Sequence, residues 1–161
     1  MLENISIKVI QKPVLDTIIE LKKLERENLG RDASINEWVI PVIIKYGKLI
    51  TVVETKNYKG SILERIIAVN ELIRKWNSFD TAFIHSFYVA KNFRNKGVGS
   101  FLLKESINLL KKDGIKKIEL TVASDNIYAV HLYEKFGFKK IGFLRDIYGK
   151  GIDRNLMVCE I

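Results

Sequence analysis

The residues Arg94 to Ser100, RNKGVGS, place two glycines between a strand-like segment and a helix-like segment. The segment before them, AFIHSFYV, is rich in β-branched and aromatic side chains, which favour strands. The segment after them, FLLKESINLLKK, has apolar residues at helical spacing. The sequence therefore predicts a strand that runs through a short glycine turn directly into a helix. The fold must contain this strand–turn–helix unit.

The glycine turn has the chemistry of an anion site. The first N–H groups of a helix have no partner within the helix and carry partial positive charge. Glycines at 97 and 99 remove the Cβ atoms that would keep a ligand away from these groups, and Arg94 and Lys96 add full charges. The turn predicts either a site for a pyrophosphate or similar anion, or a tight turn with a basic surface, and by itself it does not separate the two.

Two common phosphate motifs are excluded at this position. The P-loop requires Gly-Lys-Ser/Thr at a fixed spacing after a first glycine, and this turn lacks it. The dinucleotide fingerprint requires a third glycine near Leu102 and an acidic residue at the end of the next strand. The motif that remains is Arg94-x-x-Gly97-x-Gly99.

The order of the predicted elements indicates an α/β sandwich around a mostly antiparallel sheet. The second helix is expected to bend or restart at Pro41, and the segment 61–76 is long enough to be a helix instead of a return strand. We expect strands at 5–11, 48–56, 61–76, 81–90, 115–124, 139–149 and 153–161, and helices at 13–28, 35–47, 98–112 and 125–136.

Two of these helices have recognisable packing or end signals. Asp125 is the expected N-cap of the helix at 125–136, and Gly137 is its expected C-terminal stop. The helix at 98–112 is expected to bury one apolar stripe, made of Val98, Phe101, Leu102, Leu109 and Leu110.

Composition limits the class of protein. The 161 residues suit one domain over 1–161, and 47% hydrophobic with 29% charged residues is an ordinary globular balance. No apolar run has the length of a bilayer span, and the first residues do not read as a signal peptide. The single cysteine, Cys159, excludes an intramolecular disulfide, so a cytoplasmic location is expected. A net charge of +8 favours a polyanionic partner without separating nucleic acid from an anionic cofactor.

A second motif lies in DNIYAVHLYEKFGF. Asn126 and Tyr133 are seven residues apart, about two helical turns, so they share one face of a helix. Each alone is explained as well by a polar first-turn residue or a core tyrosine. The two residues indicate a functional site only in combination with the glycine turn.

Together the two motifs resemble the GCN5-related N-acetyltransferase (GNAT) superfamily. The segment RNKGVG is similar to the family's acetyl-CoA motif, and Asn126 to Phe138 is similar to its second hallmark. The C-terminal half most resembles the ribosomal-protein alanine N-acetyltransferases. The resemblance implies a single GNAT domain over 1–161, with a mixed, mostly antiparallel central sheet and helices on both faces.

The resemblance also implies roles for particular residues. The main chain of Phe87, Tyr88 and Val89 would pair with the pantetheine arm of acetyl-CoA. Asn126 would contact the cofactor or fix the nearby main chain, and Tyr133 would protonate the departing thiolate. The pyrophosphate would be held by the turn made of Arg94, Asn95, Lys96, Gly97, Val98, Gly99 and Ser100.

The general base stays open at this stage. The ribosomal-protein subfamily resemblance implies a catalytic Glu where this chain has Thr121, which cannot serve as a base. His85, on the strand before the glycine turn, is either a proton relay or a core histidine. Glu54 and Glu71 are reserve candidates, and Cys159 is expected to be a buried apolar residue instead of a nucleophile.

Three functions compete. The first is an acetyl-CoA-dependent N-acetyltransferase, in which a peptide N-terminus, a lysine or a small amine attacks the acetyl group directly. The second is a non-catalytic acyl-CoA-binding or sensing module on the same fold. The third and weakest is a nucleic-acid-binding domain, because the lysines are dispersed and no recognition helix is evident. The expected partners are acetyl-CoA and an amine acceptor, with no metal and no membrane, in a monomer or homodimer.

Overall fold

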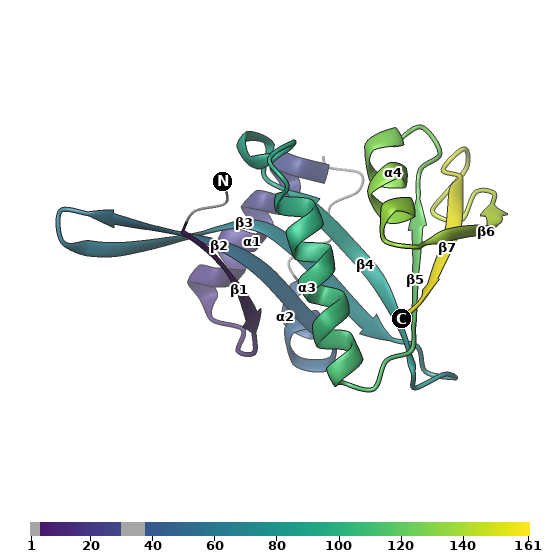
Figure 1. Ribbon diagram of the computed structural model, residues 1–161, viewed down its shortest axis with the longest axis horizontal. Helices are drawn as coiled ribbons and strands as arrows, with labels where there is room; N and C mark the ends of the chain where they lie inside the picture. Colours follow the sequence, from purple (N-terminus) through teal and green to yellow (C-terminus); the bar gives the residue numbers. More distant parts are fainter. Residues whose placement is uncertain (1–3, 30–37) are drawn as a thin grey trace. The chain divides into compact units, whose positions relative to one another are not determined.

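The computed structural model describes residues 4–29 and 38–161 (Figure 1). The predicted order of helices and strands is confirmed, with one short 3-10 helix, η1, added after the fourth strand. The elements are β1 (Ile5–Ile10), α1 (Leu15–Leu29), α2 (Val39–Tyr46), β2 (Lys48–Tyr58), β3 (Ser61–Arg74), β4 (Thr81–Val89), η1 (Lys91–Phe93), α3 (Val98–Lys112), β5 (Lys117–Val122), α4 (Ile127–Lys135), β6 (Lys139–Leu144) and β7 (Arg154–Glu160).

The strands form a seven-stranded sheet in the order β1-β2-β3-β4-β5-β7-β6. β4 and β5 run parallel, while the β1–β2, β2–β3, β5–β7 and β6–β7 pairs are antiparallel. The predicted mixed, mostly antiparallel sheet is therefore confirmed. The chain divides into two compact units: unit 1 contains residues 1–73 and 86–106, and unit 2 contains residues 74–85 and 107–161.

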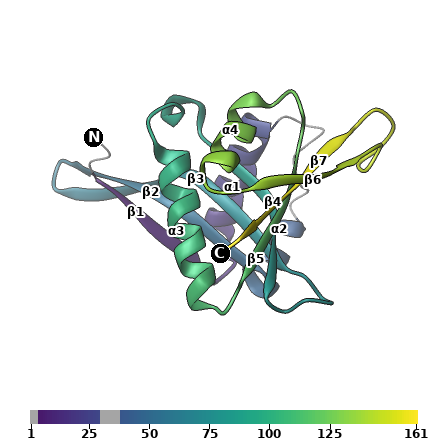
Figure 2. The ribbon, with the colours of Figure 1, turned by 45° about the vertical axis from the view of Figure 1, so that its right-hand side comes forward.

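Within unit 1, helices cover both faces of the strands. α1 and α2 lie on one face and the first part of α3 lies on the other (Figures 1 and 2). Leu21 of α1 and Ile40 of α2 are fully buried in a core that includes Val69 of β3. On the α3 side, Asn70 Nδ2 donates to Ser106 Oγ at 2.9 Å in a buried contact. Neighbouring residues of β3 thus point to opposite faces, as strand geometry requires.

The structure resolves the two ambiguous segments. Residues 61–74 are a strand, which pairs with β2 from Tyr58↔Ser61 to Lys48↔Leu72 around the predicted turn. Pro41 lies in the first turn of α2, which runs through it as one helix and does not restart there, because the first N–H groups of a helix need no partner within the helix. Residues 35–37 of the predicted second helix lie outside the described residues.

The buried face of α3 differs from the predicted stripe at two positions. Val98, Leu102 and Leu110 are buried as expected, while Phe101 and Leu109 are only half-buried. Leu103 and Ser106 complete the buried face.

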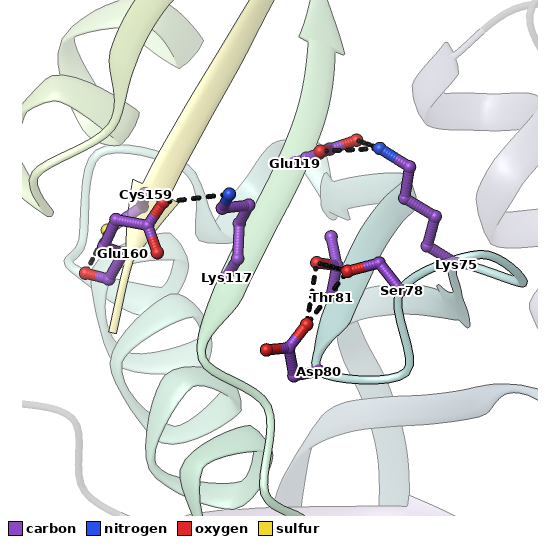
Figure 3. A network of polar contacts seen from close by, with 8 residues as sticks. All are labelled: Lys75, Ser78, Asp80, Thr81, Lys117, Glu119, Cys159 and Glu160. Atoms are coloured by element: carbon purple, nitrogen blue, oxygen red, sulfur yellow. Dashed lines mark hydrogen bonds and ion pairs between the residues drawn. The ribbon is translucent and has the colours of Figure 1, made fainter.

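In unit 2, polar contacts fix the start of β4 against β5 (Figure 3). Lys75 Nζ bonds both carboxylate oxygens of Glu119, at 3.0 and 3.1 Å. The main-chain N–H groups of Lys116 and Lys117 donate to Asp80 O at 2.7 and 3.1 Å. Cys159 on β7 is buried as predicted, and its Sγ donates to Phe136 O at 3.3 Å.

Candidate acetyl-CoA site

The glycine turn has the backbone geometry of a helix-start anion site. Gly97 has φ of 82°, a left-handed conformation that favours glycine, and Asn95 has φ of 58°. The first hydrogen bond of α3 runs from Phe101 N to Gly97 O at 2.9 Å. The N–H groups of residues 98–100 precede this bond, and the first turn of α3 contains no acidic side chain. The turn can therefore offer several N–H donors to an anion.

The side chain of Arg94 has a structural contact that the sequence did not reveal. Its Nε donates to Val89 O at 3.0 Å, and its Nη2 donates to Asn28 Oδ1 at 3.0 Å and to Asn28 O at 3.4 Å. Arg94 thus joins the end of β4 to the last turn of α1. Within unit 1, the main chain of the turn is better placed than this guanidinium to bind an anion.

Two further cationic side chains lie over the ring of Phe93, beside the turn. The guanidinium of Arg65 lies 4.8 Å from the ring centroid, and Lys96 Nζ lies 5.7 Å from it. An aromatic face attracts cations through its quadrupole. The Lys96 ammonium therefore lies over the Phe93 ring, in the turn that the sequence predicts as an anion site.

A hollow of about 410 Å³ lies in unit 1 between α1, the start of β3 and η1. Its lining includes Lys23 and Lys91 as well as Glu20 and Glu27. Glu20 is already engaged, because its Oε1 accepts from Ile66 N at 2.9 Å. With Arg65 as a third cation in the lining, the hollow carries charges of both signs.

The strand β4 presents two different faces. Tyr88 is buried, while Phe87 and Val89 on the other face are half-buried and His85 is exposed. The alternative reading of His85 as a core histidine is therefore wrong. Partial desolvation lowers the pKa of His85 below its usual 6.5, so the imidazole is neutral at neutral pH.

The start of α4 differs from the prediction in one residue. Asn126, not Asp125, is the N-cap, and its Oδ1 accepts from Ala129 N at 3.2 Å. The expected cap was wrong by one position because both residue types cap helices and only the backbone conformation separates them. Gly137, with φ of 88°, follows the end of α4 as predicted.

Tyr133 of α4 is 6% exposed, and its ring packs against Phe138 with centroids 5.5 Å apart. Burial raises the pKa of Tyr133 above its usual value, so the hydroxyl keeps its proton at neutral pH. A retained proton is what a proton donor requires.

Thr121 of β5 has a partner from the closing hairpin of unit 2. Thr121 Oγ1 and the hydroxyl of Tyr148 lie 2.9 Å apart, and the guanidinium of Arg154 lies 5.6 Å from the centroid of the Tyr148 ring. The sequence identified Thr121 only as a residue that cannot act as a base. Its contact with Tyr148 joins residues 27 positions apart, so no local sequence pattern predicts it.

The two reserve carboxylates have opposite environments. Glu54 Oε2 lies 3.5 Å from Arg65 Nη2 and 3.4 Å from Lys56 Nζ, so its charge is paired. Glu71 is fully buried, and its pKa is raised from 4.5 to about 8, first by burial and then by the charge of Glu25. The pKa of Glu71 thus lies close to neutral pH.

Comparison with known proteins decides the family. The sequence model of the Acetyltransferase (GNAT) family matches residues 23–138. The chain belongs to the GNAT family. The predicted family and fold class are both confirmed, since this GNAT chain has the predicted sheet.

Individual relatives agree with this assignment. An N-alpha-acetyltransferase of Saccharolobus solfataricus is 38% identical over 73 residues, which cover 45% of this chain and 44% of that protein. The ribosomal-protein-S18-alanine N-acetyltransferase of Escherichia coli has a TM-score of 0.76 at 19% identity, over 98% of this chain and 94% of that one. A GNAT acetyltransferase of Elizabethkingia anophelis with acetyl-CoA bound has a TM-score of 0.68 at 21% identity, over 99% of each chain.

These likenesses differ in what they support. The match to the Saccharolobus protein spans less than half of either chain, and the two structural neighbours show the shared fold. Among the helices of the described ranges, 4–29 and 38–161, none is long and apolar enough to span a bilayer.

Proposed function

We propose that this GNAT chain is an acetyl-CoA-dependent N-acetyltransferase in which a primary amine attacks the acetyl group directly. The observation that carries the proposal is the glycine turn, whose left-handed Gly97 and acid-free α3 start follow β4 in a member of this family. Acetyl-CoA supplies the acetyl group as a thioester when it is bound.

The residues of unit 1 fit the cofactor. Main-chain N–H groups over 94–100, with the charge of Lys96, would hold the pyrophosphate. The main chain of Phe87, Tyr88 and Val89 would align the pantetheine arm. The Arg94 guanidinium would set the shape of the turn through Val89 and Asn28 instead of binding the anion.

Unit 2 would supply the proton for the leaving group. Tyr133 carries a hydroxyl that stays protonated at neutral pH, which suits donation to the coenzyme A thiolate. Asn126 would fix the main chain at the start of α4 instead of contacting the cofactor directly, because its side chain caps this helix. The ammonium group of the acceptor must lose a proton before attack, and His85 and Glu71 are the leading candidates to take it, ahead of Glu54 or water alone.

We favour a peptide N-terminus as the acceptor, ahead of a lysine or a polyamine. The support is the Saccharolobus relative, which is described as an N-alpha-acetyltransferase. We further propose one GNAT domain over 1–161, a cytoplasmic location in keeping with the single cysteine, and a monomer or homodimer.

Binding and turnover test different parts of the proposal. Saturating acetyl-CoA should raise the melting temperature by linkage, and Gly99→Val should remove the shift because its side chain would occupy the anion site. Ser61→Val, at an exposed strand position of unit 1, is the matched control and should keep the shift. Absence of any shift in the unaltered protein would reject both the enzyme and the acyl-CoA-binding module.

An acceptor screen separates the remaining functions. Peptides with free N-termini, lysine peptides and polyamines are incubated with acetyl-CoA, and products are identified by mass. Binding of acetyl-CoA without product from any acceptor class would favour the sensing module. Nucleic-acid affinity that falls steeply with salt would favour the third function.

A further inference from the structure

The helix α2 of unit 1 is apolar on its outer side as well as on its inner side. Ile40, Ile43 and Ile44 are at most 5% exposed and belong to the core under the helix. Lys45 is the only charged residue in the helix, whose sequence is VIPVIIKY. A helix that is apolar all round is normally buried on every side. The outer side of α2 therefore needs a covering surface.

Three exposed side chains form a stripe along this outer side. Trp38, the N-cap of α2, is 76% exposed, Val42 is 50% exposed and Tyr46 is 74% exposed. They are four residues apart, so they lie one above another on a single face of the helix, and we call them the α2 stripe. Contiguous exposed apolar residues mark interaction sites, whereas single ones are common on any protein surface.

Two exposed residues of α1 extend the apolar surface at one end of the stripe. The end of β1 pairs with the start of β2, at Ile10↔Leu49. α1 begins shortly after Ile10 and α2 ends shortly before Leu49, so the start of α1 and the end of α2 lie at the same end of this layer. Leu15 is 68% exposed and Ile19 is 56% exposed. They therefore lie at the end of the stripe that Tyr46 occupies.

The charge on α2 selects the kind of partner. Lys45 is its one charged residue, and the Nζ of Lys45 lies 5.3 Å from the centroid of the Tyr46 ring. A nucleic acid or an anionic bilayer is bound through several cations, so one lysine attracts either of them only weakly. An apolar stripe with so little charge is best covered by another of the same kind.

The α2 stripe is complementary to a second copy of itself. When two α2 helices pack antiparallel about a two-fold axis at Val42, Trp38 of each copy faces Tyr46 of the other, and the two Val42 side chains meet. The smaller residue at the centre lets the helices approach, while the aromatic residues fill the ends. The two Lys45 residues are offset by about 9 Å along the helix axis, so the like charges do not oppose each other.

We propose that this chain forms a homodimer through the α2 stripe, with Val42 on the two-fold axis. Leu15 and Ile19 of each copy border the interface beside Tyr46. Covering the stripe and these two residues in both copies removes roughly 700–1,100 Å² of surface from water. This area is at the low end for specific interfaces, so the dimer is weak and forms at micromolar or higher concentration. It narrows the proposed monomer or homodimer to one state, and it does not rest on the proposed acetyltransferase activity.

Opposite charges at Val42 test the two-fold axis. Val42→Glu should raise the dimer dissociation constant at least about 100-fold, because two carboxylates would meet at the axis, and Val42→Lys should do the same. An equal mixture of the two variants should dimerise again, within about 10-fold of the unaltered protein, because each glutamate then meets a lysine. Ile62→Glu, at a 72% exposed position of β3, is the matched control and should leave the constant unchanged. Sedimentation equilibrium from about 1 μM to 1 mM measures these constants.

Three results would overturn the proposal. The first is a monomer at every concentration of the unaltered protein, and the second is a dimer that Val42→Glu leaves intact. The third is that the Glu and Lys variants each lose the dimer and do not pair when mixed. Binding of the monomer to vesicles of anionic lipid or to single-stranded RNA, lost in Val42→Glu, would assign the stripe to that partner instead.

The two tryptophans of the chain allow a test on the unaltered protein. The indole N–H signal of Trp38 in NMR spectra should shift as the protein concentration rises, while that of Trp76, 85% exposed in unit 2, should stay constant. The variant Trp76→Phe assigns the two signals. A constant Trp38 signal, or equal shifts of both, would overturn the proposal even if the Val42 variants do not fold. Acetyl-CoA binding, measured by calorimetry, reports separately on the proposed function.

Discussion

Arg94 Nη2 donates to Asn28 Oδ1 at 3.0 Å, across 66 positions of the sequence. Asn28 in turn donates from Nδ2 to Leu24 O at 2.7 Å, so the last turn of α1 is joined to the start of the glycine turn. The residue that opens the cofactor motif is thus also a structural link between α1 and β4.

This link makes Arg94→Lys a destabilising change in spite of the retained charge. A lysine has no planar fork to bond Val89 and Asn28 together, so we expect the free energy of unfolding to fall by about 1 kcal/mol. Urea denaturation of Arg94→Lys, Asn28→Ala and the double variant measures the coupling. Strictly additive losses would show that the contact contributes nothing, and Lys91→Ala in η1 serves as an exposed control.

The buried Glu71 predicts a stability that falls with rising pH. Its pKa is raised from 4.5 to about 8 in the folded protein, so between these values the folded state holds a proton that the unfolded state has lost. Stability from this group is complete below pH 4.5 and is lost progressively as pH rises to about 8. Glu71→Gln should flatten this part of the curve, as measured by urea unfolding at pH 5 and pH 9. An equal slope in both proteins would contradict the assigned pKa.

Tyr133→Phe should lower kcat by about 10² to 10⁴-fold while acetyl-CoA binding changes little, because only the proton donor is removed. The ring still packs on Phe138, so the melting temperature should stay close to that of the unaltered protein. Stopped assays and calorimetry measure the two effects. A parallel loss of turnover and cofactor binding would make Tyr133 a core residue only.

The pH profile of turnover distinguishes His85 from Glu71. A rate limb from His85 would lie below pH 6.5, since its pKa is lowered, whereas a limb from Glu71 would lie near pH 8. We expect His85→Gln to keep the limb near pH 8, as shown by kcat measured from pH 5.5 to 9. Loss of that limb in His85→Gln would transfer the proton-accepting role to His85.

The α4 cap offers a matched pair of variants. Asn126→Ala should lower the free energy of unfolding by about 1 kcal/mol, because Ala129 N loses its acceptor. Asp125→Ala should change it by less than about 0.5 kcal/mol, since Asp125 is exposed and outside the helix. A larger loss of unfolding free energy in Asp125→Ala than in Asn126→Ala, measured by thermal or urea unfolding, would show that Asp125 is the N-cap.

Local patterns in the sequence determined much of this protein. The order of strands and helices, the glycine turn before α3 and the stop at Gly137 all depend on periodicity and on residues within a few positions of one another. These signals are local because helices and turns are made of near neighbours. The family motifs lie in such segments, which explains why the family could be recognised before the fold was known.

Tertiary structure alone decided the chemical state of the site residues. Glu54 and Glu71 look alike in the sequence, yet one is paired with Arg65 and Lys56 and the other is buried near Glu25. A pKa depends on burial and on charges that come from other elements, which no local pattern encodes. The contacts of Arg94 with Asn28 and of Thr121 with Tyr148 have the same origin, because each joins segments that only the fold brings together.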